Sequence, residues 1–158
     1  MDSFIRPLEK LDGSAFTRHR RPVESNAKTM YSDGYPYLLC NDRSVDQINQ
    51  DVGKDLATWE NFRPNILVTS TQGPYVEDEW REIEISGVQL FGEKPCGRCS
   101  FPNVNPQTGE RNPKAEPYNT LYKTRLLKQY SKSSPMFGMN LVLDGEPGFI
   151  SVGDSVMC

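Results

Sequence analysis

Glycine and proline set the strongest constraint on this fold, because they divide the chain into short segments. Twelve residues of each type occur among its 158 residues. These two residue types are the strongest local markers of turns, and brief apolar runs between turns are typical of short strands. We therefore expect a mainly β fold, a closed or nearly closed β-barrel with a few short helices.

The apolar runs between these turns predict the strands. The expected strands are residues 37–40, 66–69, 80–85 with 88–91 as a hairpin, 140–143 and, after a turn at 145–148, 149–152. Residues 102–117 contain four prolines, which predicts a long loop. The sequence contains no visible internal repeat.

Two helices are expected. The first begins at Ser44 as the N-cap, carries Val45 and Ile48 on one face and stops at Gly53. The second has its larger side chains at helical spacing, and we expect its tyrosines to pack in the core. These side chains are Tyr118, Leu121, Tyr122 and Leu126.

The length suits one domain preceded by a basic arm. Residues 1–30 carry six basic residues against four acidic ones, whereas the whole chain has a net charge of −3. We take residues 1–30 as the arm and 31–158 as the folded domain. Within the arm, residues 18–21 read Arg-His-Arg-Arg, which suits either a phosphate contact or, the interpretation we favour, a solvated surface.

Charge and histidine content exclude several function classes. The sequence pI is about 5.2, which disfavours nucleic acid as a partner. His19 is the single histidine, so a multi-histidine metal site is excluded and any catalytic pair with histidine depends on this residue. The sequence has no apolar run long enough to span a membrane and no secretory signal, so we expect an intracellular, cytoplasmic protein with reduced thiols.

The sharpest local motif is Cys96-Gly97-Arg98-Cys99. Two thiols at this spacing suit zinc, but the second half of a zinc site is missing. They also suit thiol–disulfide exchange, although Pro102 argues against the long helix that usually follows such a motif. A third interpretation is one thiolate bound to a soft or high-valent metal, favoured by the positive charge of Arg98 and Lys94. The fourth is that both cysteines are small buried apolar side chains.

A series of motifs in a fixed order resembles the MOSC domain, the C-terminal part of molybdenum cofactor sulfurases and of mitochondrial amidoxime-reducing components. The resemblance covers residues 31–158 and is strongest to fungal members of the amidoxime-reducing type. Several separated motifs in order are more specific than any one of them. The motifs lie at residues 35–39, 61–66, 78–80, 96–99, 105–109, 134–138 and 150–156.

The resemblance implies a MOSC-type β-barrel and a set of cofactor contacts. The second cysteine of the motif, Cys99, is implied as the molybdenum ligand and catalytic residue. The other implied contacts to the molybdenum cofactor (molybdopterin) are Asp33, Gly34, Tyr35, Arg63, Asn65, Gly97 and Arg98. Arg63 suits bidentate hydrogen bonding to phosphate or pterin oxygens, and Asn65 suits a heterocycle edge. Asp33 is also a proton-carrier candidate by position.

The implied activity is an oxidoreductase that reduces N-hydroxylated small molecules. Electrons are expected from a b-type cytochrome and its flavin reductase, and mitochondrial association follows from the same resemblance. Two alternatives stay open at this point. One is a non-catalytic cofactor-binding or carrier module, and the other is a thiol-redox protein that uses Cys96 and Cys99.

Parts of the family's architecture have no expected counterpart in this sequence. Amidoxime-reducing members have an N-terminal β-domain and can carry a membrane anchor, and sulfurases have a large pyridoxal-phosphate domain. Pyridoxal phosphate binding is therefore a property of the wider family only. We expect a cofactor site that is incomplete or completed by a partner chain, with Arg18, Arg20 and Arg21 as candidates for part of the missing positive charge.

Overall fold

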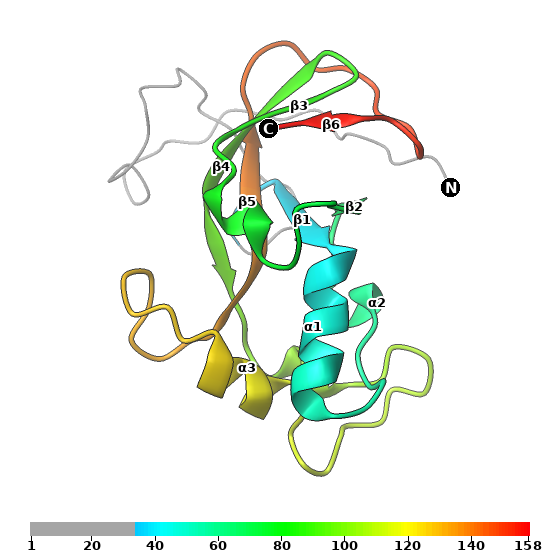
Figure 1. Cartoon of the computed structure of the whole chain (residues 1–158), viewed down its shortest axis with the longest axis vertical. Coiled ribbons are helices and arrows are strands. Elements are labelled where there is room, and N and C mark those ends of the chain that lie inside the picture. The colour runs from blue at the N-terminus through cyan, green and yellow to red at the C-terminus, as the bar shows by residue number, and fades with distance from the viewer. Residues whose placement is uncertain (1–33) are drawn as a thin grey trace.

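A curved sheet dominates the computed structural model, which describes residues 34–158. The predicted arm at residues 1–30 lies outside this part of the chain, as do Asp33 and His19. The six strands follow the order β2-β1-β5-β4-β3-β6 and curl into a nearly closed barrel (Figure 1). The mainly β prediction is therefore confirmed. The strands are β1 (Tyr37–Asn41), β2 (Ile66–Val68), β3 (Glu82–Ile85), β4 (Val88–Gly97), β5 (Met136–Leu143) and β6 (Val156–Met157).

The strand pairing places the two longest strands side by side. β4 pairs antiparallel with β5, and β5 pairs antiparallel with β1 on its other edge. β1 and β2 run parallel, and the segment with two helices between them is the long crossover connection that parallel strands need. The predicted hairpin of β3 and β4 is confirmed, with Ile85 opposite Val88 across the turn.

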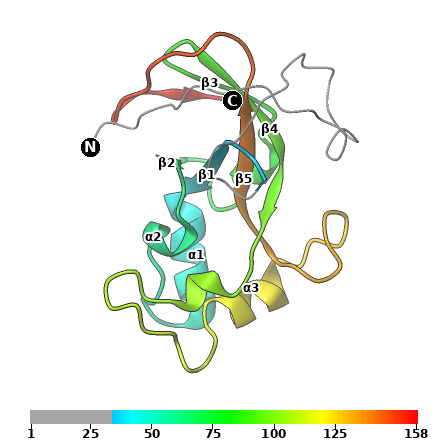
Figure 2. The same ribbon diagram turned by 180° about the vertical axis from the view of Figure 1, so that it is seen from behind.

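The helices gather at one end of the sheet (Figures 1 and 2). They are α1 (Asp42–Val52), α2 (Trp59–Phe62) and α3 (Tyr118–Thr124), with the short 3₁₀ helix η3 (Phe101–Asn103). A second 3₁₀ helix, η2 (Val76–Glu79), packs against β1 and β5 beside the start of α1. The long loop after η3 lies at the same end. β4 and β5 reach from the barrel into this helical end, so they connect the two parts of the molecule.

The first helix begins three residues earlier than the sequence predicts. Asn41 is its N-cap and accepts a hydrogen bond from the Arg43 amide, whereas Ser44 is buried and bonds Glu77. The predicted stop is confirmed, because Gly53 adopts the left-handed conformation with φ 79°. Both Asn and Ser are good N-caps, so composition alone could not choose between them.

Two further predictions are wrong. Residues 149–152 form no strand; β6 begins at Val156 and pairs with β3. Tyr122 is exposed rather than packed in the core, because α3 turns Leu121 inward. The seven residues of α3 are too few to bury a broad apolar face.

Two apolar clusters form the core. The barrel cluster lies between the strands and includes Leu39, Ile83, Met139 and Leu141. A second cluster, here called the helical-end cluster, lies under α1 and α2. It contains Cys40, Val45, Ile48, Ala57, Phe62, Leu121 and Phe137.

Candidate functional site

The Cys-x-x-Cys motif lies where β4 leaves the sheet. Cys96 and Gly97 are the last residues of the strand, and the next amide, that of Arg98, donates to the Pro135 carbonyl at 2.8 Å. The pairing of β4 with β5 shifts register twice, between Gly92 and Lys94 just before the motif and between Pro95 and Gly97 at its start. Such irregularities bend a strand and redirect its side chains, so the motif turns away from the ladder.

The two thiols have different surroundings. Cys99 is exposed, and its sulfur accepts a hydrogen bond from the Phe101 amide at 3.5 Å. Cys96 is half-buried, and Nη1 of Arg98 lies 3.4 Å from its sulfur. The motif leads into η3, which spans only three residues, so the absence of a long helix after Pro102 is as predicted. Cys99 is the thiol that a ligand from solvent can reach.

Arg98 reaches back to α2. Its Nη2 donates to the Phe62 carbonyl at 2.7 Å, and its guanidinium lies 5.6 Å from the centre of the Phe62 ring. Its positive charge also acts on Cys40 beneath it. Burial raises the pKa of the Cys40 thiol, and the nearby Arg98 opposes that rise. Arg98 is thus engaged within the protein on two of its three nitrogens.

Arg63 is brought to the same turn from the other side. It ends α2 in the left-handed conformation, with φ 58°, and its side chain is exposed. Its guanidinium carbon lies 5.5 Å from the centre of the Phe101 ring. Within residues 34–158 this guanidinium has no hydrogen bond or ion pair, so its donors remain available to an anion.

Asn65 lies between the Arg63 turn and β1. Its Oδ1 accepts from the Leu38 amide at 2.7 Å, and its own amide donates to the Leu38 carbonyl at 2.8 Å. Among residues 34–158 the Nδ2 group of Asn65 makes no hydrogen bond, so it can donate to a ligand. Gly34 is exposed, and Tyr35 is half-buried with its ring 5.7 Å from Nζ of Lys94 on β4. The structure thus brings Arg63, Gly97, Arg98 and Cys99 together, with Asn65 beside them.

Two residues of this region escaped the prediction. Asn61 is buried, and its Nδ2 donates to the carbonyls of Pro102 and Val104 at 3.0 Å each. Arg111 donates to the carbonyl and hydroxyl oxygens of Ser100 at 3.1 and 3.3 Å. Asn61 is the first residue of the motif that contains Arg63 and Asn65, so its position in that motif could have identified it from the sequence. Nothing in the sequence distinguishes Arg111 from other charged loop residues.

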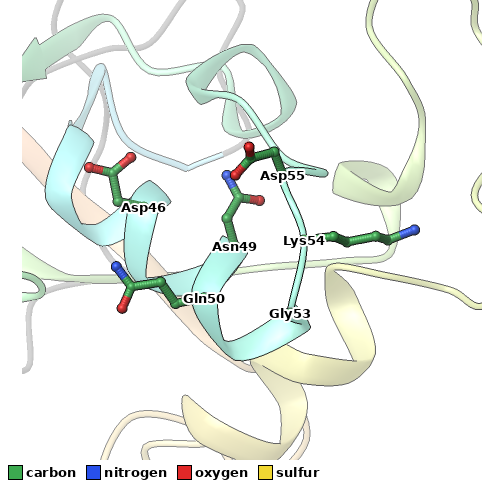
Figure 3. Close-up of a pocket in the computed structure, with 6 residues that line it drawn as sticks. All are labelled: Asp46, Asn49, Gln50, Gly53, Lys54 and Asp55. Atoms are coloured by element: carbon green, nitrogen blue, oxygen red, sulfur yellow. The ribbon is translucent and has the colours of Figure 1, made fainter.

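A hollow of about 390 Å³ lies elsewhere, at the C-terminal end of α1 (Figure 3). Its lining consists of Asp46, Asn49, Gln50, Gly53, Lys54 and Asp55. The Asn49 side chain turns toward the segment that carries Asp55, while Lys54 extends away. None of the predicted site residues lines this hollow. In the described part of the chain, no three potential histidine, cysteine or carboxylate ligands lie together as a metal-binding group.

Comparison with known families gives one match over most of the chain. The family model described as the MOSC domain matches residues 26–157. The region from Asn61 to Cys99, which carries the arrangement described above, lies within it.

Individual relatives agree with this match. The chain is 39% identical to mitochondrial amidoxime-reducing component 1 of Homo sapiens over 131 residues, which cover 80% of this chain and 37% of that protein. It is 34% identical to component 1 of Mus musculus, with 89% and 44% covered. It is 34% identical to component 2 of Homo sapiens, with 85% and 40% covered. The chain therefore spans about two fifths of the length of these curated relatives.

Among residues 34–158, no helix has both the length and the apolar character needed to cross a membrane.

Proposed function

The chain belongs to the MOSC domain family, and from that premise we propose that it binds the molybdenum cofactor through Cys99 and reduces N-hydroxylated small molecules. The relatives are named amidoxime-reducing components, so the family includes oxidoreductases. The observation that carries the proposal is the convergence on one turn of an exposed thiol and an arginine that has no hydrogen bond or ion pair among residues 34–158. Cys99 and Arg63 reach it from separate segments, β4 and α2.

The donor set suits this cofactor. A soft thiolate is the kind of ligand that a soft or high-valent metal prefers, and Cys99 offers it at the surface. The terminal phosphate of a pterin needs a cation and amide donors, which Arg63 and the Nδ2 group of Asn65 supply. Gly97 and Arg98 are proposed as contacts from the end of β4 and the turn after it, and Gly34, Tyr35 and Asp33 as contacts from the segment before β1. Asp33 lies outside the described residues.

The protein's part in the reaction is to bind and orient. When bound, the cofactor supplies two-electron oxygen-transfer chemistry at its metal. The Phe101 amide fixes the direction of the Cys99 sulfur, and Arg63 holds negative charge beside it. Reduction of an N–OH group to N–H takes two electrons and two protons and releases water. We propose that the electrons come from a b-type cytochrome and its flavin reductase. We also propose mitochondrial association, residues 1–30 as a basic arm and 31–158 as the MOSC domain.

Metal analysis tests the proposal directly. The full chain is expressed with molybdate in a host that makes the cofactor, alongside Cys99→Ser and the matched Cys96→Ser. We expect stoichiometric molybdenum in the wild type and in Cys96→Ser, and loss of the metal in Cys99→Ser. Full retention of molybdenum in Cys99→Ser would show that Cys99 is not the molybdenum ligand.

The same proteins separate the two alternative functions. Stoichiometric molybdenum without reduction of an N-hydroxylated substrate would favour a cofactor-binding or carrier module. A reversible disulfide between Cys96 and Cys99 with no bound metal would favour a thiol-redox protein. The structure records both thiols as free.

A further inference from the structure

Buried hydrogen bonds tie the segment that ends in Arg63 to the segment around Cys99. We propose that Asn61 is the positioning residue of this site, holding Arg63 in a fixed place against the Cys99 turn. The inference deepens the proposed function and rests on it. It concerns a residue that has no contact of its own with a ligand.

Asn61 uses both ends of its amide group. Its Oδ1 accepts from the Thr58 amide at 2.8 Å, which anchors it to the first turn of α2. Its Nδ2 donates to the Pro102 and Val104 carbonyls, both at 3.0 Å and more than 40 residues away in sequence. The side chain is only 6% exposed. A buried carbonyl left without its donor is costly, because it loses its hydrogen bond to water without gaining another, so this connection is strongly specified.

Arg98 supplies a second tie on the other side of Cys99. It donates to the Phe62 carbonyl, the residue between Asn61 and Arg63. Consecutive residues of α2 therefore hold the loop both before and after Cys99. Because the loop is fixed at both of its ends, the Cys99 turn cannot shift relative to Arg63 without breaking one of these bonds.

The conformation of Arg63 explains why such a tie is needed. The left-handed conformation is unfavourable for a residue other than glycine, and it persists where the surrounding contacts hold it in place. Here the Arg63 amide donates to the Trp59 carbonyl, and the side chain lies over Phe101. Asn61 helps to hold both of these contacts in place. It lies within α2, which carries Trp59, and it binds the carbonyls of Pro102 and Val104, which follow Phe101.

Asn49 provides a matched control for the test. Its Nδ2 donates to the Ala57 carbonyl at 2.8 Å, and its Oδ1 accepts from the Leu56 and Ala57 amides. The change Asn49→Asp therefore removes the same kind of donor next to the same helix, α2, without touching the Cys99 loop. Asn61→Asp keeps the acceptor toward Thr58 and places an oxygen opposite two carbonyls.

The experiment compares Asn61→Asp, Asn49→Asp, Arg63→Ala and the double variant Asn61→Asp/Arg63→Ala in the full chain. Molybdenum retained during timed dialysis is the first measurement, and hydrogen exchange of residues 98–104 in the cofactor-free protein is the second. Loss of a residue that orients a metal ligand set typically weakens metal binding about 10- to 100-fold. We expect at least about tenfold faster molybdenum loss in Asn61→Asp than in Asn49→Asp, and faster exchange of residues 98–104 only in Asn61→Asp.

The double variant separates positioning from general destabilisation. If Asn61 acts through Arg63, the double variant loses molybdenum no faster than the worse single variant, because coupled residues are not additive. Two outcomes would overturn the inference while leaving the proposed function intact. One is a double variant whose rate of molybdenum loss rises by the product of the two single effects, and the other is equal molybdenum retention in Asn61→Asp and Asn49→Asp. A wild type without molybdenum would instead overturn the proposed function, and hydrogen exchange would still decide whether Asn61 holds the turn. If Asn61→Asp does not fold, Asn61→Ala removes the donors without adding charge.

Discussion

The barrel and the helical end of this molecule are stabilised in different ways. The barrel cluster is made mostly of aliphatic side chains on strands, such as Ile83 and Leu141, which are both fully buried. The helical end also has an apolar cluster, but buried polar groups surround it. Asn41, Ser44, Asn61 and Glu77 are all buried there and are joined to loops by hydrogen bonds.

This difference follows from what each region has to hold. Strands satisfy their own main-chain groups by pairing, so a barrel needs only apolar side chains on its inner face. The helical end contains long irregular loops whose carbonyls and amides have no ladder to join, and side chains must supply the partners. Such directed bonds fix the loop that carries Cys99. The candidate site therefore lies in the region where polar side chains determine the loop geometry.

The largest expected effect comes from the ring pair under the site. Phe137 is fully buried and stacks on Phe62 with ring centres 3.9 Å apart. Removing it in Phe137→Ala is expected to lower the free energy of unfolding by about 3–5 kcal/mol. It should also release molybdenum, because the Phe62 carbonyl binds Arg98. Urea unfolding and metal analysis measure the two effects.

Leu141→Ala is the matched change in the barrel. It should lower the free energy of unfolding by about 2–5 kcal/mol and leave molybdenum content unchanged where the protein is folded. Equal loss of metal from both variants would show that the two regions do not differ in the way proposed.

A smaller effect is expected where the two regions meet, at Gly138 on β5. Its φ is 76°, and a Cβ there would lie 2.8 Å from both the Cys40 sulfur and the Leu39 carbonyl oxygen. Leu39 belongs to the barrel cluster and Cys40 to the helical-end cluster. Gly138→Ala should cost about 1–2 kcal/mol for the backbone conformation and about 1–3 kcal/mol for the overlap.

Gly109→Ala separates these two contributions. Gly109 has φ 73°, but a Cβ there would meet no atom within 4 Å. Only the conformational cost of about 1–2 kcal/mol is expected in urea unfolding. If both alanine variants lost the same stability, close packing between the clusters at Gly138 would be disproved.

The comparison also explains which features the sequence could predict. Strands such as Ile66–Val68 and the β3–β4 hairpin are visible because local apolar runs and turn residues encode them. The short β6 is not encoded locally: Phe149 and Val152 are strongly exposed despite their strand-like pattern, and pairing with β3 selects Val156–Met157 instead. Tertiary contacts override local preference in such short segments.

The candidate site was predictable to a similar degree. Motif order identified Arg63 and Cys99, and the structure brings their segments together through Phe101. The bonds of Asn61 to residues 102 and 104 join partners far apart in sequence, and no local pattern announces them. The hydrogen bond from Arg98 to the Phe62 carbonyl could not be predicted from the sequence either.

The smallest expected effect is a pH dependence from buried carboxyl groups at the helical end. Glu77 is fully buried, and its two oxygens accept from Ser44 at 2.7 Å and Asn41 at 3.3 Å. Burial raises the pKa of Glu77 above its ordinary value of 4.5, although the Ser44 hydrogen bond opposes the rise. Asp78 beside it has a raised pKa for the same reason, despite its ion pair with Arg125.

The sign of the effect follows from the direction of these shifts. With rising pH the unfolded chain loses the Glu77 proton before the folded protein does, so the free energy of unfolding decreases from about pH 4.5 upward through the raised pKa.

The Gln side chain in Glu77→Gln cannot titrate. The free energy of unfolding of this variant should therefore decrease less between pH 5 and pH 8 than that of the wild type, with the part due to Asp78 remaining. Glu79→Gln, an exposed change in the same 3₁₀ helix, should keep most of the decrease, because the Glu79 charge is only the smallest of the causes that act on the pKa of Asp78. Urea unfolding at both pH values measures all three proteins, and an unchanged pH dependence in Glu77→Gln would show that the buried carboxyl does not distinguish the helical end from the barrel.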